Sequence, residues 1–148
     1  MAIQDTFGED IAYGFPGMEA DGGLSNIRSM HLEGATACPF GTPVYEGATD
    51  KGVDLTVDAN LVGFAIARKG LPVTEDRAAD TYAPGDTIPV KERGTIWVTA
   101  SKAVNKGDPV YVTAGRAITN TSSGNTAATG WEFDMTIAAA GIVRIARR

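Results

Sequence analysis

The chain has 148 residues, of which 43% are hydrophobic and 21% charged, values typical of a globular protein and not of a disordered chain. The sequence has no run of about 18 apolar residues, so we expect no membrane-spanning helix and no membrane partner. The single cysteine, Cys38, excludes an intramolecular disulfide, and the single histidine, His31, leaves little room for a histidine-based triad or metal site. We therefore predict no catalytic residue, no metal site and no cofactor.

The negative charge is concentrated at the N-terminal end. Residues 1–33 contain six acidic residues and one basic residue, a balance of −5 that equals the net charge of the whole chain. Nucleic-acid binding requires Lys and Arg side chains that neutralise phosphates. We therefore expect no nucleic-acid partner.

Residues 1–33 are predicted to form an extended arm with local turns. Three apolar side chains near the start are spaced four apart, which allows a short helix, but Pro16 and the many glycines oppose regular structure. Apolar groups in so interrupted a stretch must pack on the body of the protein or on another chain. We expect the arm to bind a partner through Phe7, Ile11, Tyr13, Phe15 and Pro16. The alternative is that the arm covers one end of its own barrel.

From residue 34 onward the hydrophobic period is two, as in Thr95–Thr99, and short runs of β-branched and aromatic residues are separated by glycine-containing turns. We predict an all-β body over residues 34–148, a compact β-barrel or a jelly-roll-like β-sandwich. The predicted strands are residues 42–46, 53–57, 61–67, 87–91, 95–100, 109–113, 116–119, 131–137 and 140–146. Residues 92–94 are predicted to form a three-residue hairpin loop with Gly94 at the left-handed position.

The body contains an internal repeat. Gly41-Thr42-Pro43-Val44-Tyr45 is matched 66 residues later by Gly107-Asp108-Pro109-Val110-Tyr111, and each proline suits the first position of a strand. Residues 63–69 likewise resemble residues 141–148. The second repeat is longer by 12 residues, so we predict that residues 119–130 form an exposed loop.

Candidate catalytic and ligand-binding side chains have plainer structural interpretations. Asp54 and Asp58 are predicted to be solvated carboxylates at a strand edge, because no aromatic residues frame them as in a glycosidase. Cys38 is expected to pack as a small hydrophobe. Trp97 and Trp131 are expected in the core or in an interface.

The sequence resembles a known family over nearly its whole length. The segment Gly14-x-Pro16-Gly17-x-x-Ala20-Asp21 resembles the N-terminal arm of the structural cement, or head decoration, proteins of tailed bacteriophages. The body is similar in the two Gly-x-Pro-Val-Tyr motifs, in the run from Ile88 to Val98, and in the closing Gly141-Ile142-Val143.

The resemblance implies a non-enzymatic virion protein that binds the outer surface of the capsid and clamps neighbouring major capsid subunits. It also implies a homodimer or a homotrimer, and leaves open which of the two forms. A β-barrel tail or adhesion module that binds host glycan is the alternative, and only Tyr82 and Trp131 are placed to stack on sugar. A small hydrolase that uses Asp54 and Asp58 is a third interpretation.

Overall fold

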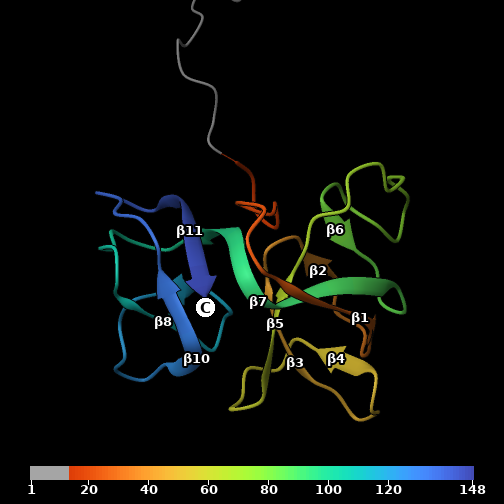
Figure 1. Ribbon diagram of the computed structural model, residues 1–148. Coiled ribbons are helices and arrows are strands. Elements are labelled where there is room, and N and C mark those ends of the chain that lie inside the picture. Colours follow the sequence, from red (N-terminus) through yellow and green to blue (C-terminus); the bar gives the residue numbers. More distant parts are fainter. Residues whose placement is uncertain (1–13) are drawn as a thin grey trace, which may run out of the picture.

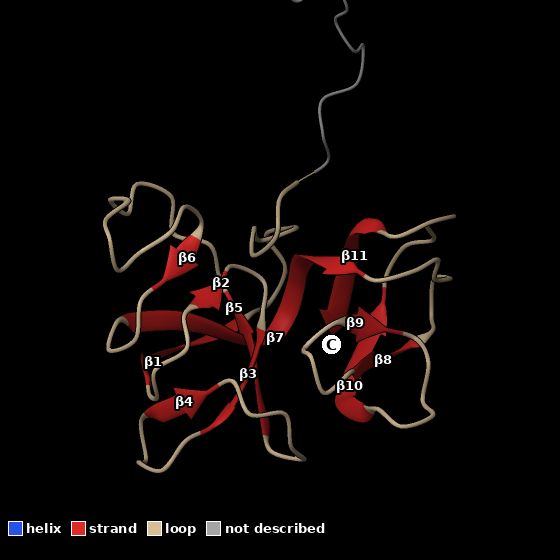
Figure 2. Cartoon of the chain, turned by 180° about the vertical axis from the view of Figure 1, so that it is seen from behind, coloured by secondary structure: helices blue, strands red, loops and turns tan. Residues whose placement is uncertain are grey.

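The β-branched and aromatic runs of the sequence form strands, and the computed structural model, which describes residues 14–148, has no helix in that range (Figures 1 and 2). The strands are β1 (Asn26–Leu32), β2 (Cys38–Pro39), β3 (Pro43–Glu46), β4 (Gly52–Asp54), β5 (Leu61–Ala65), β6 (Thr81–Tyr82), β7 (Thr87–Ala100), β8 (Pro109–Val112), β9 (Ile118–Thr119), β10 (Thr126–Phe133) and β11 (Gly141–Arg147). Between residues 14 and 148, therefore, the structure contains no helix that could cross a membrane.

Two closed β-barrels share the long strand β7. The first barrel runs β1-β4-β3-β5-β7 and closes by the pairing of β7 with β1. The second runs β7-β11-β10-β8-β9 and closes by the pairing of β9 with β7. Figure 1 shows the barrels as two lobes, with β7 passing from one to the other. The expectation of an all-β barrel body is thus confirmed.

The two barrels have the same topology, which explains the internal repeat. In both, the first and third strands pair in parallel, β1 with β4 and β7 with β9, and the other pairs are antiparallel. The two matching motifs begin equivalent strands, and Pro43 and Pro109 occupy the first position of β3 and β8 as predicted. By topology, however, β5 corresponds to β10 and not to β11, so the match of residues 63–69 with 141–148 is not a structural equivalence.

The predicted hairpin at residues 92–94 is wrong, because β7 continues through them. Its first half pairs with β1, up to Asn26 opposite Arg93, and its second half pairs with β11, from Arg147 opposite Gly94 onward. The two halves pair with different neighbours and not with each other. Gly94 has φ +118°, and a Cβ there would lie 2.9 Å from Cβ of Ser25, so the change of partner requires glycine.

The prediction that all of residues 119–130 form an exposed loop is also wrong. Residues 126–130 belong to β10, where Ala128 is buried. No 12-residue insertion is needed, because Pro109 pairs with Glu132 much as Pro43 pairs with Phe64.

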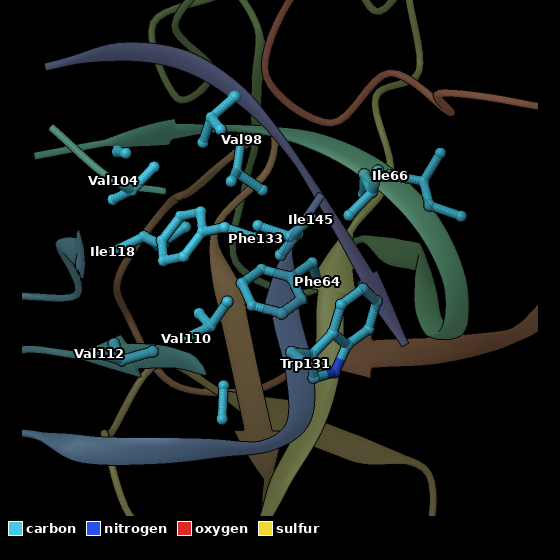
Figure 3. Packing of buried hydrophobic residues seen from close by; sticks show 14 residues of the cluster. Phe64, Ile66, Val98, Val104, Val110, Val112, Ile118, Trp131, Phe133 and Ile145 are labelled. Carbon is cyan, nitrogen blue, oxygen red and sulfur yellow. The ribbon is translucent and has the colours of Figure 1, made fainter. Parts of the chain in front are cut away.

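The two barrels have connected cores. One cluster fills the first barrel, and the other fills the second but includes Phe64 and Ile66 from the β5 region of the first. Figure 3 shows Phe64 among side chains of the second barrel. Its ring contacts Trp131 edge-on, with centroids 4.9 Å apart. The barrels therefore pack as one unit.

Part of the segment predicted as an arm belongs to the first barrel. Asn26–Leu32 form β1, which pairs with both β7 and β4. Residues 1–13 lie outside the described residues. The division into an arm of residues 1–33 and a body of residues 34–148 therefore stays a prediction.

Candidate partner interface

Residues 14–20 lie on the junction of the two barrels. The amide of Gly17 donates to the Trp97 carbonyl at 2.8 Å, and the amide of Trp97 donates to the Met18 carbonyl at 2.9 Å. The amide of Ala67, just beyond β5, donates to the Gly17 carbonyl at 2.8 Å. Glu19 continues the contact by an antiparallel bridge to Ile96. This part of the chain is therefore hydrogen-bonded to strands of its own body.

Gly17 allows the backbone to approach this closely. Its φ is +84°, and a Cβ there would lie 2.7 Å from the amide nitrogen of Ala67 and 2.9 Å from that of Gly41. Any other residue would clash with backbone that has no freedom to move, in addition to the strain of the left-handed conformation. The Pro16-Gly17 pair of the sequence is thus a docking point.

An ion pair strengthens the attachment. Lys91 on β7 is fully buried, and its Nζ lies 2.5 Å from Oε1 of Glu19. The same ammonium also donates to the Thr95 carbonyl at 3.4 Å. Because a buried charge is costly without a partner, Glu19 fixes the position of the segment on β7.

Phe15 and Pro16 contact their own chain. The Nζ of Lys69 lies 4.4 Å from the centre of the Phe15 ring and 5.9 Å from that of Phe40, and it pairs with Asp80 at 2.6 Å. Both Phe15 and Pro16 are half-buried. For this part of the segment the structure shows the alternative arrangement, in which the arm packs on its own barrels.

The remaining predicted contact residues, Phe7, Ile11 and Tyr13, lie outside the described residues. Sequence reasoning did not single out Glu19 or Lys91. The local sequence gives little signal, because Lys91 is followed by Glu92 and Arg93, a charged triplet that is typical of a solvent-exposed turn.

Three apolar side chains within and just after this attachment are exposed. Met18, Leu24 and Ile27 are exposed, and 97% of Leu24 is accessible to solvent. Leu24 borders an open hollow of about 600 Å³ between residues 21–26, the bend of β7 and the end of β11. A hollow that combines one fully exposed apolar side chain with charged residues offers a place where another chain can bind.

The side chains that were considered as catalytic or reactive groups have structural roles. Asp54 accepts the amide of Thr56 at 2.9 Å and Asp58 accepts that of Asn60 at 2.6 Å, so each carboxylate holds its own turn. Cys38 is buried, and desolvation raises the pKa of its thiol to about 12. In the part of the chain that the structure describes, no three His, Cys, Asp or Glu residues are grouped to hold a metal ion.

The aromatic side chains proposed for glycan stacking are not on the surface. Tyr82 and Trp131 are both buried, and the Tyr82 hydroxyl donates to the Ile66 carbonyl at 2.6 Å. The expectation that Trp97 and Trp131 belong to the core or an interface is confirmed, since both are buried.

Comparison with known proteins decides the family. A family model described as "Structural cement protein (E217 gp24/Pam3 gp6)" matches residues 3–148. The chain belongs to the structural cement protein family. It is therefore a structural protein of the phage virion capsid, as the resemblance implied.

A solved structure contains a chain of similar fold. A chain in a structure of the capsid of Myoviridae phage XM1 is similar with a TM-score of 0.77 and 18% sequence identity, over 100% of this chain and 98% of that chain. No curated protein sequence matches this cement protein.

Proposed function

We propose that this protein binds the outer surface of the phage head and clamps neighbouring subunits of the shell through residues that precede its docked segment. In this proposal it catalyses no reaction and binds neither nucleic acid nor membrane. Copies associate as a dimer or a trimer. The observation that carries the proposal is the attachment of residues 14–20 to the barrel junction. This attachment fixes the point on the body from which the preceding residues extend to a partner.

The five predicted contact residues divide into two roles. Phe15 and Pro16 hold the base of the segment on the body, where Phe15 packs on Lys69. Phe7, Ile11 and Tyr13 supply apolar contacts to the neighbouring subunit. Buried apolar area contributes about 25 cal/mol per Å² before the cost of ordering the segment is subtracted.

A modest contact of this kind is sufficient on a shell. Copies that are linked to one another present several segments to the same surface, and the second contact then forms at a high effective concentration. Reinforcement of the shell follows, because separating two capsid subunits requires breaking contacts that span them. No observation favours the glycan-binding alternative, since Tyr82 and Trp131 are buried.

Deleting residues 2–13 tests the proposal. The deletion keeps Gly17 and Glu19, so the barrels should fold, with an unchanged melting temperature. Purified protein is mixed with heads that lack it, the heads are pelleted, and the bound copies are counted by gel densitometry. We expect binding to weaken at least about tenfold, because the apolar contacts are lost.

The matched control is Val73→Ser, which removes an exposed apolar side chain outside the docked segment. It should decorate heads as well as the wild-type protein. Full decoration by the deletion variant would overturn the proposal.

A further inference from the structure

The hollow beside Leu24 carries an excess of positive charge. Three arginines border it, Arg93, Arg147 and Arg148, against one carboxylate, that of Asp21. Arg147 donates to the Glu92 carbonyl at 3.2 Å, and Arg148 pairs with Asp134 at 3.2 Å. The exposed guanidinium of Arg93 forms no hydrogen bond or ion pair within residues 14–148. An apolar side chain and an unpaired cation therefore stand next to each other at this site.

One stretch of this chain has the complementary pattern. Residues 1–13 contain three acidic residues and no Lys or Arg. In an extended conformation, every second side chain points the same way at intervals of about 6.6 Å, so one face of the stretch alternates between apolar and acidic. The side chains on that face are Ile3, Asp5, Phe7, Glu9 and Ile11.

The direction of the docked segment favours a second copy as the source of this stretch. The amide of Ala20 donates to the Thr95 carbonyl, whereas the amide of Gly17 donates to that of Trp97, so the chain moves away from the hollow as it is followed back toward residue 14. Figure 1 shows this segment, in red, entering above β7 between the two lobes. Residues 3–11 of the same chain would have to reverse direction to reach the hollow.

We infer that the hollow beside Leu24 receives residues 3–11 of a second copy, with the acidic side chains near Arg93 and the apolar ones on Leu24. The inference rests on the proposed function and deepens it: the neighbouring subunit that Phe7 and Ile11 contact would be a second copy of this protein, and the linked copies would together hold the shell subunits beneath them. Each copy would both donate a segment and accept one, which links the cement proteins to one another over the shell. Eleven extended residues span roughly 36 Å, enough to reach an adjacent copy.

Charge exchange between two full-length variants tests the inference. Arg93→Glu reverses the unpaired charge of the hollow, and a variant with Asp5→Lys and Glu9→Lys reverses the charges of the donated segment. Self-association is measured by sedimentation equilibrium. Because like charges then face each other, we expect each variant alone to associate at least about tenfold more weakly than the wild-type protein.

Mixing the two variants distinguishes a second copy from the same chain. In the mixture, the acidic segment of one variant meets Arg93 of the other, and the reversed segment meets the reversed hollow, so association should return. If each segment bound its own hollow, mixing would restore nothing. A mixture that fails to recover, a wild-type protein that stays monomeric, or an Arg93→Glu variant that associates normally would each overturn the inference.

Two further variants separate local contacts from net charge and from folding. Lys106→Glu makes the same change of charge at an exposed residue outside the hollow, and it should leave association unchanged. Leu24→Ser should weaken association without changing charge. Equal weakening by Lys106→Glu, or no effect of Leu24→Ser, would contradict the inference.

Failure of this inference would not imply failure of the proposed function. If Arg93→Glu associates normally while deletion of residues 2–13 abolishes decoration, the segment grips the shell elsewhere and only the inference is wrong. Full decoration by the deletion variant would instead overturn the proposed function.

Discussion

Lys91 carries an ammonium in the interior of the body, and Glu19 from the N-terminal segment is its only acidic partner in residues 14–148. The two residues are far apart in sequence, so the pair forms only when the segment lies on β7. Glu19 remains half exposed, which weakens the attraction through solvent screening. Its main effect is therefore to prevent the larger cost of leaving Lys91 unpaired.

We predict that Glu19→Gln lowers the free energy of unfolding by about 1–3 kcal/mol, because a buried ammonium then lacks a counter-charge. Lys91→Met removes the charge and keeps much of the volume, so it should cost less. In the double variant, Glu19→Gln should add little further cost. Urea unfolding of the wild-type protein, the two single variants and the double variant gives the values. If Glu19→Gln costs as much in the Lys91→Met background as in the wild-type protein, the two residues are not coupled.

At the level of single residues, the sequence predicted the burial of Cys38, Trp97 and Trp131 because these residue types are most often found inside. For Phe15 and Pro16 it favoured contact with a partner and gave packing on their own barrel only as the alternative. That arrangement depends on Gly17 meeting Gly41 and Ala67, residues far apart in sequence whose proximity is a product of the tertiary fold.

Among the elements, the strands that begin with a clear turn signal were predicted most closely. β3 and β8 start close to the expected positions, at the prolines, whereas β1 was assigned to the arm because Pro16 and the glycines of residues 1–33 oppose regular structure, and Asn26–Leu32 alternates only at Met30-His31-Leu32 and around Ile27. Its outward face is largely exposed, so binary patterning is weak. The continuous strand β7 was missed because a glycine with positive φ is expected both in a hairpin turn and in a bend between two barrels. The sequence around Gly94 does not distinguish the two.

The loop between β3 and β4 is held by a carboxylate from the end of β1. Glu33 accepts the amides of Ala48 at 2.7 Å and Thr49 at 3.2 Å, and the hydroxyl of Thr49 at 2.5 Å. The Thr49 hydroxyl, followed by the Ala48 amide, lowers the pKa of Glu33 below its usual 4.5. Above pH 4.5 the ionised carboxylate therefore stabilises the folded state, and this contribution is lost as the pH falls through the lowered pKa.

We predict that Glu33→Gln lowers stability at pH 7 and that its effect shrinks in acid. As the pH falls from 7 toward 3, the wild-type carboxyl becomes increasingly protonated, so the two proteins should approach each other in stability. Urea unfolding at both pH values measures the difference. A difference of the same size at pH 7 and pH 3 would show that the charge of Glu33 is unimportant for the loop.

For the whole molecule, the shared strand and the joined cores couple the two barrels. β7 closes both barrels, and the first barrel contributes Phe64 to the core of the second, where the ring contacts Trp131. Neither barrel can lose its structure without leaving the other open at β7. We therefore expect a pull on the docked segment at the junction to reach both barrels at once.

Leu32→Ala tests this coupling from one barrel to the other. Leu32 is fully buried in the core of the first barrel, and its truncation should cost about 2–5 kcal/mol. Trp131 on β10 belongs to the core of the second barrel and reports on it, whereas Trp97 on β7 lies outside that core and faces the docked segment at Gly14. If the barrels unfold together, the urea midpoint measured by tryptophan fluorescence falls as far as that measured by far-UV circular dichroism.

The control Leu24→Ala makes the same chemical change at a side chain that is 97% exposed, and in dilute protein it should leave both midpoints in place. A fluorescence midpoint that stays fixed in Leu32→Ala, with a circular dichroism transition in two steps, would show that the second barrel folds independently of the first.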